Sequence, residues 1–397
     1  WHRIAWPRVN THALRAERRR GADAWGAAGR CGVIVMPTGT GKTDVALDLM
    51  RQVMLSTLVV APVRDLMYQW HRRILAGLGY DSGIVGDNIW NVRPVTCTTY
   101  DSACIHAPRI GNRFALIVFD ECHHLRGPIR SDAARMSAAP MRLGLTATWE
   151  PGQGRHARMS ELIGPVVYDL PLGEVAGATL ADYQVVRIPV HLASDERARY
   201  RDCSAEVRRF RQMILKEKPG FTWQDLPAEA AKNPDARRAL LAWHTRESIE
   251  DRAIEKLRVL EDLFRLHAGT PMIVFTGSNK MAREVSRRFL LPCLLHHCGK
   301  RERAAILAGF REGTYPVLVA NEVLDEGVDL PAAKVAVVLG GHASTRQAKQ
   351  RLGRILRRHG GCSATLYEVV CAETREEERS RERRKSDAYT QIGRAHV

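Results

Sequence analysis

The stretch Met36-Pro37-Thr38-Gly39-Thr40-Gly41-Lys42-Thr43 decides the fold of this chain. An apolar run ends at Pro37 and an amphipathic run begins near Thr43, which predicts a buried strand, a glycine-rich turn and a helix. Gly39 and Gly41 let the backbone turn tightly and bring its N–H groups close to an anion, at the positive end of the helix. The sequence therefore predicts a phosphate-binding loop.

Two side chains of this loop have the chemistry of a nucleoside-triphosphate site. Lys42 has the reach to contact the β- and γ-phosphates, and the Thr43 hydroxyl is a ligand for Mg²⁺. The strict pattern has glycine where this chain has Met36, although the strand–loop–helix context is unchanged. A chance glycine turn is the alternative. We expect ATP and Mg²⁺ as cofactors, with the nucleotide held by Thr38, Gly39, Thr40, Gly41, Lys42 and Thr43.

Composition limits the class of protein. The 397 residues, 45% hydrophobic and 26% charged, are enough for about two to three domains with ordinary cores. No apolar run approaches the roughly 20 residues that span a bilayer, so we expect no membrane partner and a cytoplasmic location. The net charge of +16 makes polyanions plausible partners, and a solvated basic surface is the alternative.

The nine cysteines contain no C-x-x-C pair, which favours a reducing compartment with most thiols in cores. One group, residues 293–298 (CLLHHC), has the soft ligands of a zinc site. The same residues also read as an apolar strand that runs into a loop, and we favour the strand.

Strand-like runs alternate with helical patterns twice along the chain. The first set is 31–36, 57–61, 95–98, 114–119 and 142–146, and the second is 272–276, 292–296, 316–320, 334–339 and 364–370. This alternation predicts an α/β fold with two parallel sheets, each covered by helices on both faces. Ligands of such sheets bind at the carboxyl ends of strands, where the glycine loop falls.

We place the first domain at residues 12–180 and the second at 181–372, with a highly charged helical insertion at 195–266. Residues 373–391 read as a mixed-charge helix or solvated tail. The last six residues, 392–397, match the translation of a common sequencing-adaptor string, so we expect a read-through artefact. Because the chain starts at Trp1, we also expect that its natural N-terminus is missing.

Two adjacent carboxylates follow the apolar run at 114–119. At the carboxyl end of a strand in the same sheet as the loop, Asp120 is suited to hold Mg²⁺, usually through water. Glu121 is suited to orient and deprotonate an attacking water. Taken alone, the pair could equally be a turn or a helix cap; together with the loop it predicts a hydrolytic site.

A further strand ends in Thr146, Ala147 and Thr148. An ordinary strand terminus is the better interpretation of these residues in isolation. Beside a nucleotide site, their hydroxyl groups have the position to connect that site to whatever the protein moves, so we assign them a coupling role.

The second half of the chain contains a basic helical face. Gln350, Arg354 and Arg357 are spaced i, i+4 and i+7 and therefore share one side of a helix. Two guanidiniums that project together suit phosphate oxygens, and an arginine supplied across a cleft accelerates phosphoryl transfer by about 10³ to 10⁵. A solvated basic face is the alternative.

Together these motifs resemble those of the helicase-type ATPases of superfamily 2. The likeness is greatest to the DNA-repair helicases of the XPB type and to related bacterial, type III restriction-like enzymes. It extends from about Leu14 to Arg384 and rests on the order and spacing of five motifs, at 37–43, 120–123 (DECH), 146–148 (TAT), 324–331 and 350–357 (QRLGRILR). The resemblance implies two RecA-like P-loop domains with ATP and Mg²⁺ bound between them.

The resemblance also implies roles for individual residues. His123 is expected to couple hydrolysis to domain movement. Gly327 and Asp329 are expected to contact nucleotide, and Arg354 and Arg357 to reach the γ-phosphate. Family members bind mainly the sugar–phosphate backbone, which implies binding largely independent of sequence. The residues expected along this nucleic-acid groove are Pro62, Arg64, Thr99, Thr276 and Asn321.

The chain departs from the family pattern at three places. Residues 14–18 read Leu-Arg-Ala-Glu-Arg instead of Leu-Arg-Pro-x-Gln. Arg15 is still expected to stack on adenine, but the glutamine that reads the base is absent, which leaves the choice between ATP and GTP open. Asn321 replaces the usual threonine. The Arg-Glu-Asp element of XPB proteins is replaced by residues 149–152 (WEPG), which leaves strand separation open.

We therefore predict an ATP-dependent helicase or translocase that acts on DNA in the 3′→5′ direction, in repair or processing. A double-strand translocase of a restriction-type system that does not separate strands is the alternative enzyme. A basic nucleic-acid-binding protein with a decayed ATPase is the non-enzymatic alternative. The expected partners are a nucleic acid, with DNA favoured over RNA, and accessory nuclease or repair proteins, and we expect a monomer.

Overall fold

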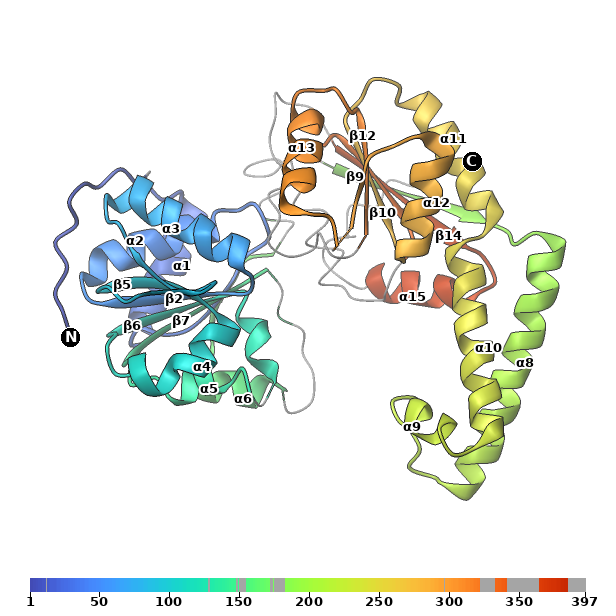
Figure 1. The fold of residues 1–397 in the computed structure, drawn as a ribbon, viewed down its shortest axis with the longest axis horizontal. Coiled ribbons are helices and arrows are strands. Elements are labelled where there is room, and N and C mark those ends of the chain that lie inside the picture. Colours follow the sequence, from blue (N-terminus) through green and yellow to red (C-terminus); the bar gives the residue numbers. More distant parts are fainter. Residues whose placement is uncertain are drawn as a thin grey trace. The chain divides into compact units, whose positions relative to one another are not determined.

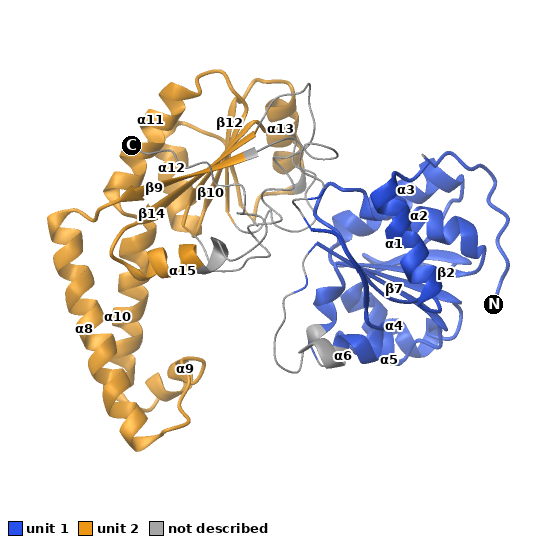
Figure 2. Ribbon diagram, turned by 180° about the vertical axis from the view of Figure 1, so that it is seen from behind, with its two compact units in different colours: residues 1–182, 325–332, 345–362 blue, residues 183–324, 333–344, 363–397 orange. Residues whose placement is uncertain are grey.

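The chain divides into two compact units, one containing the described residues up to Glu174 and the other those from Tyr183 onward (Figure 2). Each unit is built around its own sheet. The computed structural model describes residues 1–11, 13–127, 129–147, 149, 155–171, 174, 183–295, 297–321, 333–340 and 364–384.

The first unit contains an eight-stranded sheet in the order β4-β3-β5-β2-β6-β7-β1-β8. Only the pair β3–β4 at one edge is antiparallel among the described strands. The inner strands are buried along nearly their whole length because helices cover both faces. The strands are β1 (Cys31–Val35), β2 (Thr57–Ala61), β3 (Gly83–Gly86), β4 (Ile89–Asn91), β5 (Val95–Thr99), β6 (Leu116–Asp120), β7 (Met141–Thr146) and β8 (Val166–Asp169).

The register of the parallel strands brings their carboxyl ends to one edge of this sheet. Val35 at the end of β1 pairs with Thr146 of β7. Asp120 at the end of β6 pairs with the residue before Thr146, and Ala61 of β2 pairs with Thr99 of β5. The three motifs predicted in this unit therefore lie at the edge where a ligand of a parallel sheet binds.

Helices cover both faces of the first sheet (Figure 1). On one face lie α1 (Ala16–Ala27), α2 (Lys42–Val53) and α3 (Arg64–Leu78), and on the other lie α4 (Tyr100–Ile110), α5 (Asp132–Arg135) and α6 (Arg155–Leu162). A short 3₁₀ helix, η1 (Cys122–Arg126), follows β6. Trp25 anchors α1: its side chain is buried and its Nε1–H donates to the carbonyl oxygen of Arg142 at 2.9 Å.

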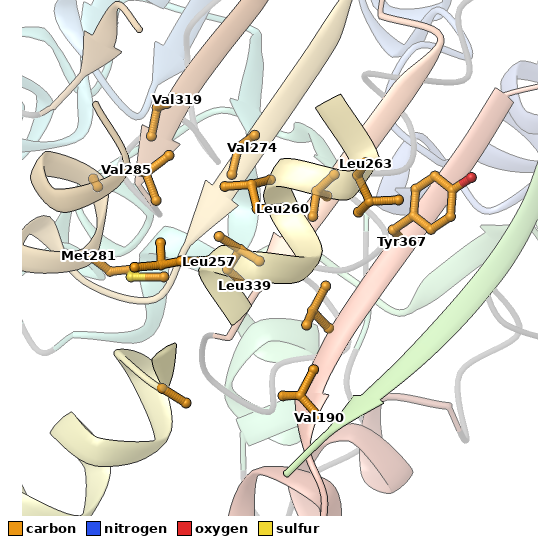
Figure 3. Packing of buried hydrophobic residues seen from close by; sticks show 14 of the residues in the cluster. Val190, Leu257, Leu260, Leu263, Val274, Met281, Val285, Val319, Leu339 and Tyr367 are labelled. Carbon is orange, nitrogen blue, oxygen red and sulfur yellow. The ribbon is translucent and has the colours of Figure 1, made fainter. Parts of the chain in front are cut away.

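The second unit contains a six-stranded parallel sheet in the order β11-β12-β10-β13-β14-β9. Its core forms where α11 and α12 pack on one face of the sheet; Figure 3 shows Leu257, Leu260 and Leu263 of α11 among Val274, Val319 and Leu339. The elements are β9 (Tyr183–Val190), β10 (Met272–Thr276), β11 (Cys293–Leu294), β12 (Val317–Asn321), β13 (Val335–Leu339), β14 (Ala364–Cys371), α11 (Ile254–Leu266), α12 (Asn279–Phe289) and α13 (Lys300–Arg311).

A helical hairpin is inserted between β9 and α11. Helices α8 (Ser194–Glu217) and α10 (Pro234–Asp251) lie side by side, with α9 (Leu226–Ala230) at the far end (Figure 1). Asn233 caps α10 by accepting hydrogen bonds from the N–H groups of Asp235 and Ala236, with Pro234 at the first helical position. The hairpin has a small apolar core of its own, formed by Phe210, Ile214, Leu226, Ala230, Ala236 and Ala239.

The predicted α/β class with parallel sheets in two domains is confirmed. The helical stretch predicted at 195–266 divides, since its last helix, α11, belongs to the core of the second unit. The charged stretch after Cys371 forms α15 (Arg375–Arg384), whose Glu376 and Ser380 are buried. Within the described ranges, none of the helices has the length and apolar character needed to cross a membrane.

Candidate nucleotide site

The glycine loop leads from the buried strand β1 into α2. Gly39 and Gly41 have φ angles of 84° and 88°, in the left-handed region that glycine adopts without strain. Gly41 immediately precedes Lys42, the first residue of α2, so the loop presents the free N–H groups of a helix N-terminus. The angle at Gly41 favours glycine, and a Cβ atom there would lie 2.5 Å from Cζ of Arg18, so the Arg18 side chain would have to move.

The side chain of Lys42 is held inside the loop. Its Nζ donates to the carbonyl oxygen of Met36 at 3.1 Å and lies 3.7 Å from Oε1 of Glu121. Thr40 is fully buried and donates to the carbonyl oxygen of Pro37 at 2.6 Å, which closes the turn. The buried hydroxyl of Thr38 has no hydrogen-bond partner among the described residues. The loop thus combines a lysine, an unsatisfied hydroxyl and a helix N-terminus, which suits a phosphate group.

Asp120 ends β6 beside this loop. Its Oδ2 accepts a 2.8 Å hydrogen bond from Nε1–H of Trp70, and its backbone carbonyl accepts one at 2.9 Å from the Tyr100 hydroxyl. Burial raises the pKa of the Asp120 carboxyl, and the neighbouring Glu121 carboxylate raises it further. The Trp70 hydrogen bond and Lys42 oppose both effects. A buried carboxylate in this setting favours a bound cation.

Glu121 has a backbone conformation that non-glycine residues rarely adopt, with φ of 48°. The turn directs its carboxylate to Lys42 on one side and to β7 on the other: Oε2 accepts a 3.4 Å hydrogen bond from Thr146 Oγ1. Strained residues of this kind cluster at active sites. The observed position supports Glu121 as the base that orients a water.

His123 completes a cluster with Glu121 and Thr146. Its buried ring has Nδ1 3.2 Å from Thr146 Oγ1 and 3.5 Å from Oε2 of Glu121. The ends of β6 and β7 are thereby linked through three side chains from two of the predicted motifs. Ala147 is buried beside them, and Thr148 lies outside the described residues.

Arg18 lies at the glycine loop, although the sequence analysis assigned it no role there. Arg15, predicted to contact adenine, is exposed just before the first turn of α1. Arg18, one turn later, lies against Gly41 and donates to Oδ2 of Asp44 at 3.0 Å. Its position in the sequence could have indicated this role, because Arg18 stands where the family has the glutamine that reads the base. Arg18 is therefore the cation of α1 that contacts the phosphate loop.

The residues predicted to contact nucleic acid in the first unit lie at two adjacent strand ends. Thr99 ends β5 and caps α4 by accepting from the N–H of Ser102 at 3.3 Å. Pro62 is buried after β2, whose last residue pairs with Thr99. Arg64 begins α3, with its guanidinium exposed and 2.7 Å from Oδ1 of Asp87.

The corresponding residues of the second unit also meet. Thr276 and Asn321 end β10 and β12 and are partners in the register of these parallel strands. The Asn321 side-chain amide donates to Oδ1 of Asn279 at 2.7 Å, and Thr276 Oγ1 donates to the carbonyl oxygen of Ser278 at 3.1 Å. Gly327, Asp329, Gln350, Arg354 and Arg357 lie outside the described residues.

The site fits a nucleoside triphosphate and a divalent cation on the chemistry of its donors. Lys42, the Thr38 hydroxyl and the helix N-terminus provide positive or donor groups for phosphates. The Asp120 carboxylate and the Thr43 hydroxyl, at the start of α2, are the oxygen ligands that Mg²⁺ prefers.

Two family models match the chain. The model described as "Type III restriction enzyme, res subunit" matches residues 12–151, and that described as "Helicase conserved C-terminal domain" matches residues 255–359. Each match contains the motifs predicted for one of the two domains.

Similar proteins carry helicase names. The DNA 3′-5′ translocase XPB2 of Sulfurisphaera tokodaii is 40% identical over 374 residues, which cover 94% of this chain and 84% of that protein. The DNA 3′-5′ helicase XPB of Kineococcus radiotolerans is 28% identical and matches 92% of this chain. The chain spans 61% of the length of this second relative.

Solved structures share the fold. Saccharomyces cerevisiae Dbp5 bound to RNA and ADP BeF3 superposes with a TM-score of 0.63 at 16% identity, covering 96% of this chain and 89% of that chain. The helicase domain of Pyrococcus furiosus Hef gives a TM-score of 0.58 at 18% identity, covering 91% and 96%. The prediction of two RecA-like domains is confirmed. With the relatives above, this shows that the chain belongs to the XPB-like DNA 3′–5′ helicases and translocases of superfamily 2.

Proposed function

We propose that the chain is a motor that hydrolyses ATP to move along DNA. The observation that carries the proposal is the convergence of Lys42, Asp120 and Glu121 at one edge of the first sheet, beside a loop whose two glycines have left-handed backbone angles. Family membership supports the activity, and the geometry supports the residues that perform it.

In this proposal the residues of the first unit divide the work. Lys42 and the N–H groups of α2 bind the phosphates, while Asp120 and Thr43 hold Mg²⁺. Bound ATP supplies the phosphoryl bond that is broken, and Mg²⁺ neutralises charge on its phosphates. The Glu121 carboxylate orients a water molecule and accepts its proton.

The contacts of Glu121 with Thr146 and His123 support coupling between ATP hydrolysis and domain movement. A change in the charge of the Glu121 carboxylate alters its hydrogen bond with Thr146 and its attraction to His123. Thr146 is the last residue of β7, and His123 lies just after β6. We propose that these two residues transmit the change from bound ATP to hydrolysis products to the rest of the protein.

The second domain completes the site in this proposal. Arg354 and Arg357 reach the γ-phosphate when the domains close, Gln350 accompanies them, and Gly327 and Asp329 contact the nucleotide. ATP binding would close the cleft and hydrolysis would reopen it. These assignments stay predictions from the motifs.

We propose DNA rather than RNA as the track, with 3′→5′ movement, on the names of the XPB relatives. Pro62, Arg64 and Thr99 of one unit and Thr276 and Asn321 of the other would contact the backbone of one strand. The net charge of +16 supports a polyanionic partner. Accessory nuclease or repair proteins and a monomeric state stay predictions. None of the eight described cysteines forms a disulfide, which supports the proposed cytoplasmic location.

Phosphate release from ATP, measured without nucleic acid and with single-stranded DNA, duplex DNA or RNA, tests the proposal. We expect strong stimulation by DNA in the unaltered chain and none in Lys42→Ala or Glu121→Gln. Turnover that survives in Lys42→Ala would contradict the site. Stimulation by RNA alone would contradict the track.

A double-strand translocase that does not unwind is the second candidate. The observation that favours it is Trp149, with Glu150 to Gly152, at the place of the Arg-Glu-Asp element. Unwinding of a tailed duplex distinguishes the two, with displacement of a third strand from a triplex as the measure of translocation. Displacement without unwinding would support this second candidate.

A further inference from the structure

A cavity of about 600 Å³ lies at the root of the helical hairpin, in the second unit. It is lined by α8, α10, the end of β9 and the segment 372–381, which contains α15. Seven arginines and three glutamates line it. Its volume is within the range of about 300–1,000 Å³ that small-molecule sites occupy.

One wall is a polar stripe along α8. Arg197, Arg201, Ser204, Arg208 and Arg211 follow a 4-3-4-3 spacing, which places all five on one side of the helix. Arg201, Arg208 and Arg211 are exposed at the cavity, and no ion pair holds them within the described residues. A face of this kind is free to bind an anion.

Arg246 of α10 forms the floor of the cavity and is 5% exposed. Within the described chain its guanidinium makes no hydrogen bond or ion pair. The two carboxylate oxygens of the nearby Glu250 accept hydrogen bonds from the Tyr200 hydroxyl and from Arg379, so Glu250 acts on Arg246 through its charge and not through a hydrogen bond. Burial lowers the pKa of Arg246 and the positive charge of Arg375 lowers it further, whereas Tyr200, Glu250 and Glu247 raise it.

The hydroxyl of Ser204 is a second unsatisfied group in the same wall. Its Oγ is buried and has no hydrogen-bond partner among the described residues. A buried hydroxyl without a partner destabilises a fold, and so does a largely buried guanidinium without a hydrogen bond, because neither fully recovers the hydration it has lost. A bound anion would satisfy both groups. Trp223 also lines the cavity, and an aromatic side chain in such a place is suited to stack on a base.

We propose that this arginine cavity binds a phosphate group, at a site separate from the glycine loop. Several guanidiniums directed at one space match a phosphate, whose oxygens accept paired hydrogen bonds from more than one arginine. The phosphate belongs either to the end of a nucleic-acid strand or to a free phosphorylated small molecule. The binding does not depend on ATP hydrolysis.

Pyrophosphate binding, measured by calorimetry and by thermal unfolding, tests the proposal in the Lys42→Ala chain, where the glycine loop is weakened. We expect Arg246→Met to reduce the affinity at least tenfold. Arg209→Met is the matched control: Arg209 lies on α8, outside the cavity lining, paired with Glu206 at 2.7 Å. Equal affinity in the Arg246→Met and Arg209→Met chains would overturn the proposal.

A second variant and readout separate binding from misfolding. Without an anion, Arg246→Met should unfold at the temperature of its parent or above it, because it removes a largely buried guanidinium that makes no hydrogen bond or ion pair in the described chain. The double variant Arg201→Gln/Arg208→Gln changes exposed residues only and should also lose affinity. Full affinity for pyrophosphate in this double variant would also overturn the proposal.

The source of the phosphate is distinguished with short DNA strands that carry either a 5′-phosphate or a 5′-hydroxyl. Tighter binding of the phosphorylated strand that disappears in Arg246→Met identifies a strand end. Pyrophosphate binding that depends on Arg246, without any such difference, identifies a free phosphorylated molecule. The ATPase assay of the proposed function is independent, since a motor without this cavity would still release phosphate.

Discussion

Trp70 of α3 donates its indole N–H to Oδ2 of Asp120, 50 residues away at the end of β6, over 2.8 Å. The hydrogen bond fixes the carboxylate that we assign to Mg²⁺. Hydrogen bonds to charged groups contribute about 1.5–3 kcal/mol. We expect Trp70→Phe to raise the Mg²⁺ concentration for half-maximal ATPase activity by about tenfold.

Trp25→Phe is the control for that measurement, because it also removes a buried indole donor from the first unit. It should lower stability without changing the dependence on Mg²⁺. If both variants raised the Mg²⁺ concentration for half-maximal activity equally, the effect would come from lower stability of the whole unit and not from the hydrogen bond to Asp120.

The raised pKa of Asp120 predicts how stability depends on pH. The folded chain holds this proton more tightly than the unfolded chain. The carboxyl therefore contributes stability that is complete below the unfolded pKa, near 3.8, and is lost as pH rises through the raised value. Without nucleotide or Mg²⁺, Asp120→Asn should melt at a higher temperature than the unaltered chain at pH 8. That difference should shrink toward pH 4, and a lower melting temperature at every pH would refute the assignment.

Gly41→Ala should weaken ATP binding, because the new Cβ displaces the Arg18 guanidinium from the loop in addition to the strain of a φ of 88°. Gly29→Ala isolates the strain, since Gly29 has φ of 71° with open space around it. Both variants should lose about 1–2 kcal/mol of stability from the backbone angle. Titration with a fluorescent ATP analogue should show lost affinity only in Gly41→Ala, and unchanged affinity there would contradict the loop geometry.

His123→Ala should lower the distance moved on DNA per ATP hydrolysed, because it removes the ring that links Glu121 to Thr146. The ratio is obtained from strand-displacement and phosphate-release rates on the same DNA. His124→Ala, one residue further, should leave the ratio unchanged. An equal fall of both rates in His123→Ala would argue against a coupling role.

Lys256 and Glu376 form a fully buried ion pair of 2.8 Å that joins α11 to α15. Breaking such a pair by removing one partner costs about 3–5 kcal/mol. We expect a loss of that size in Lys256→Met and recovery of most of it in Lys256→Met/Glu376→Leu, measured by urea unfolding. A double variant no more stable than the single one would show that the unpaired charge is not the cause.

The sequence was sufficient for features that depend on neighbours along the chain. The loop at 36–43 and the pair Asp120-Glu121 follow directly from an apolar run that ends in the right residue types, and both lie where expected. The run predicted as a strand at 114–119 forms strand β6 only from Leu116 onward. Phe114 and Ala115 are buried just before it, and Ala115 already donates its N–H to the carbonyl oxygen of Ser56.

Features that depend on packing partners could not be predicted in the same way. Trp70 and Arg18 reach the site from helices whose placement is decided by topology, so spacing alone gives no signal. The short strands β3, β4 and β8 at the sheet edges have too few residues for a clear period. The mixed charges after Cys371 left a helix and a solvated tail both open, because the burial of Glu376 depends on its ion pair with Lys256, 120 residues earlier.

The inserted hairpin has a mechanical consequence. Helix α8 has 24 residues and is therefore about 36 Å long. A lever arm of that length amplifies motion: a rotation of about 5° at its base displaces its tip by roughly 3 Å, close to the rise of one DNA base pair. The base is clamped by the buried charges of Lys256, Glu250 and Glu376, while the tip has an independent core. A small rotation of the sheet would thus move the tip of the hairpin by about the rise of one DNA base pair.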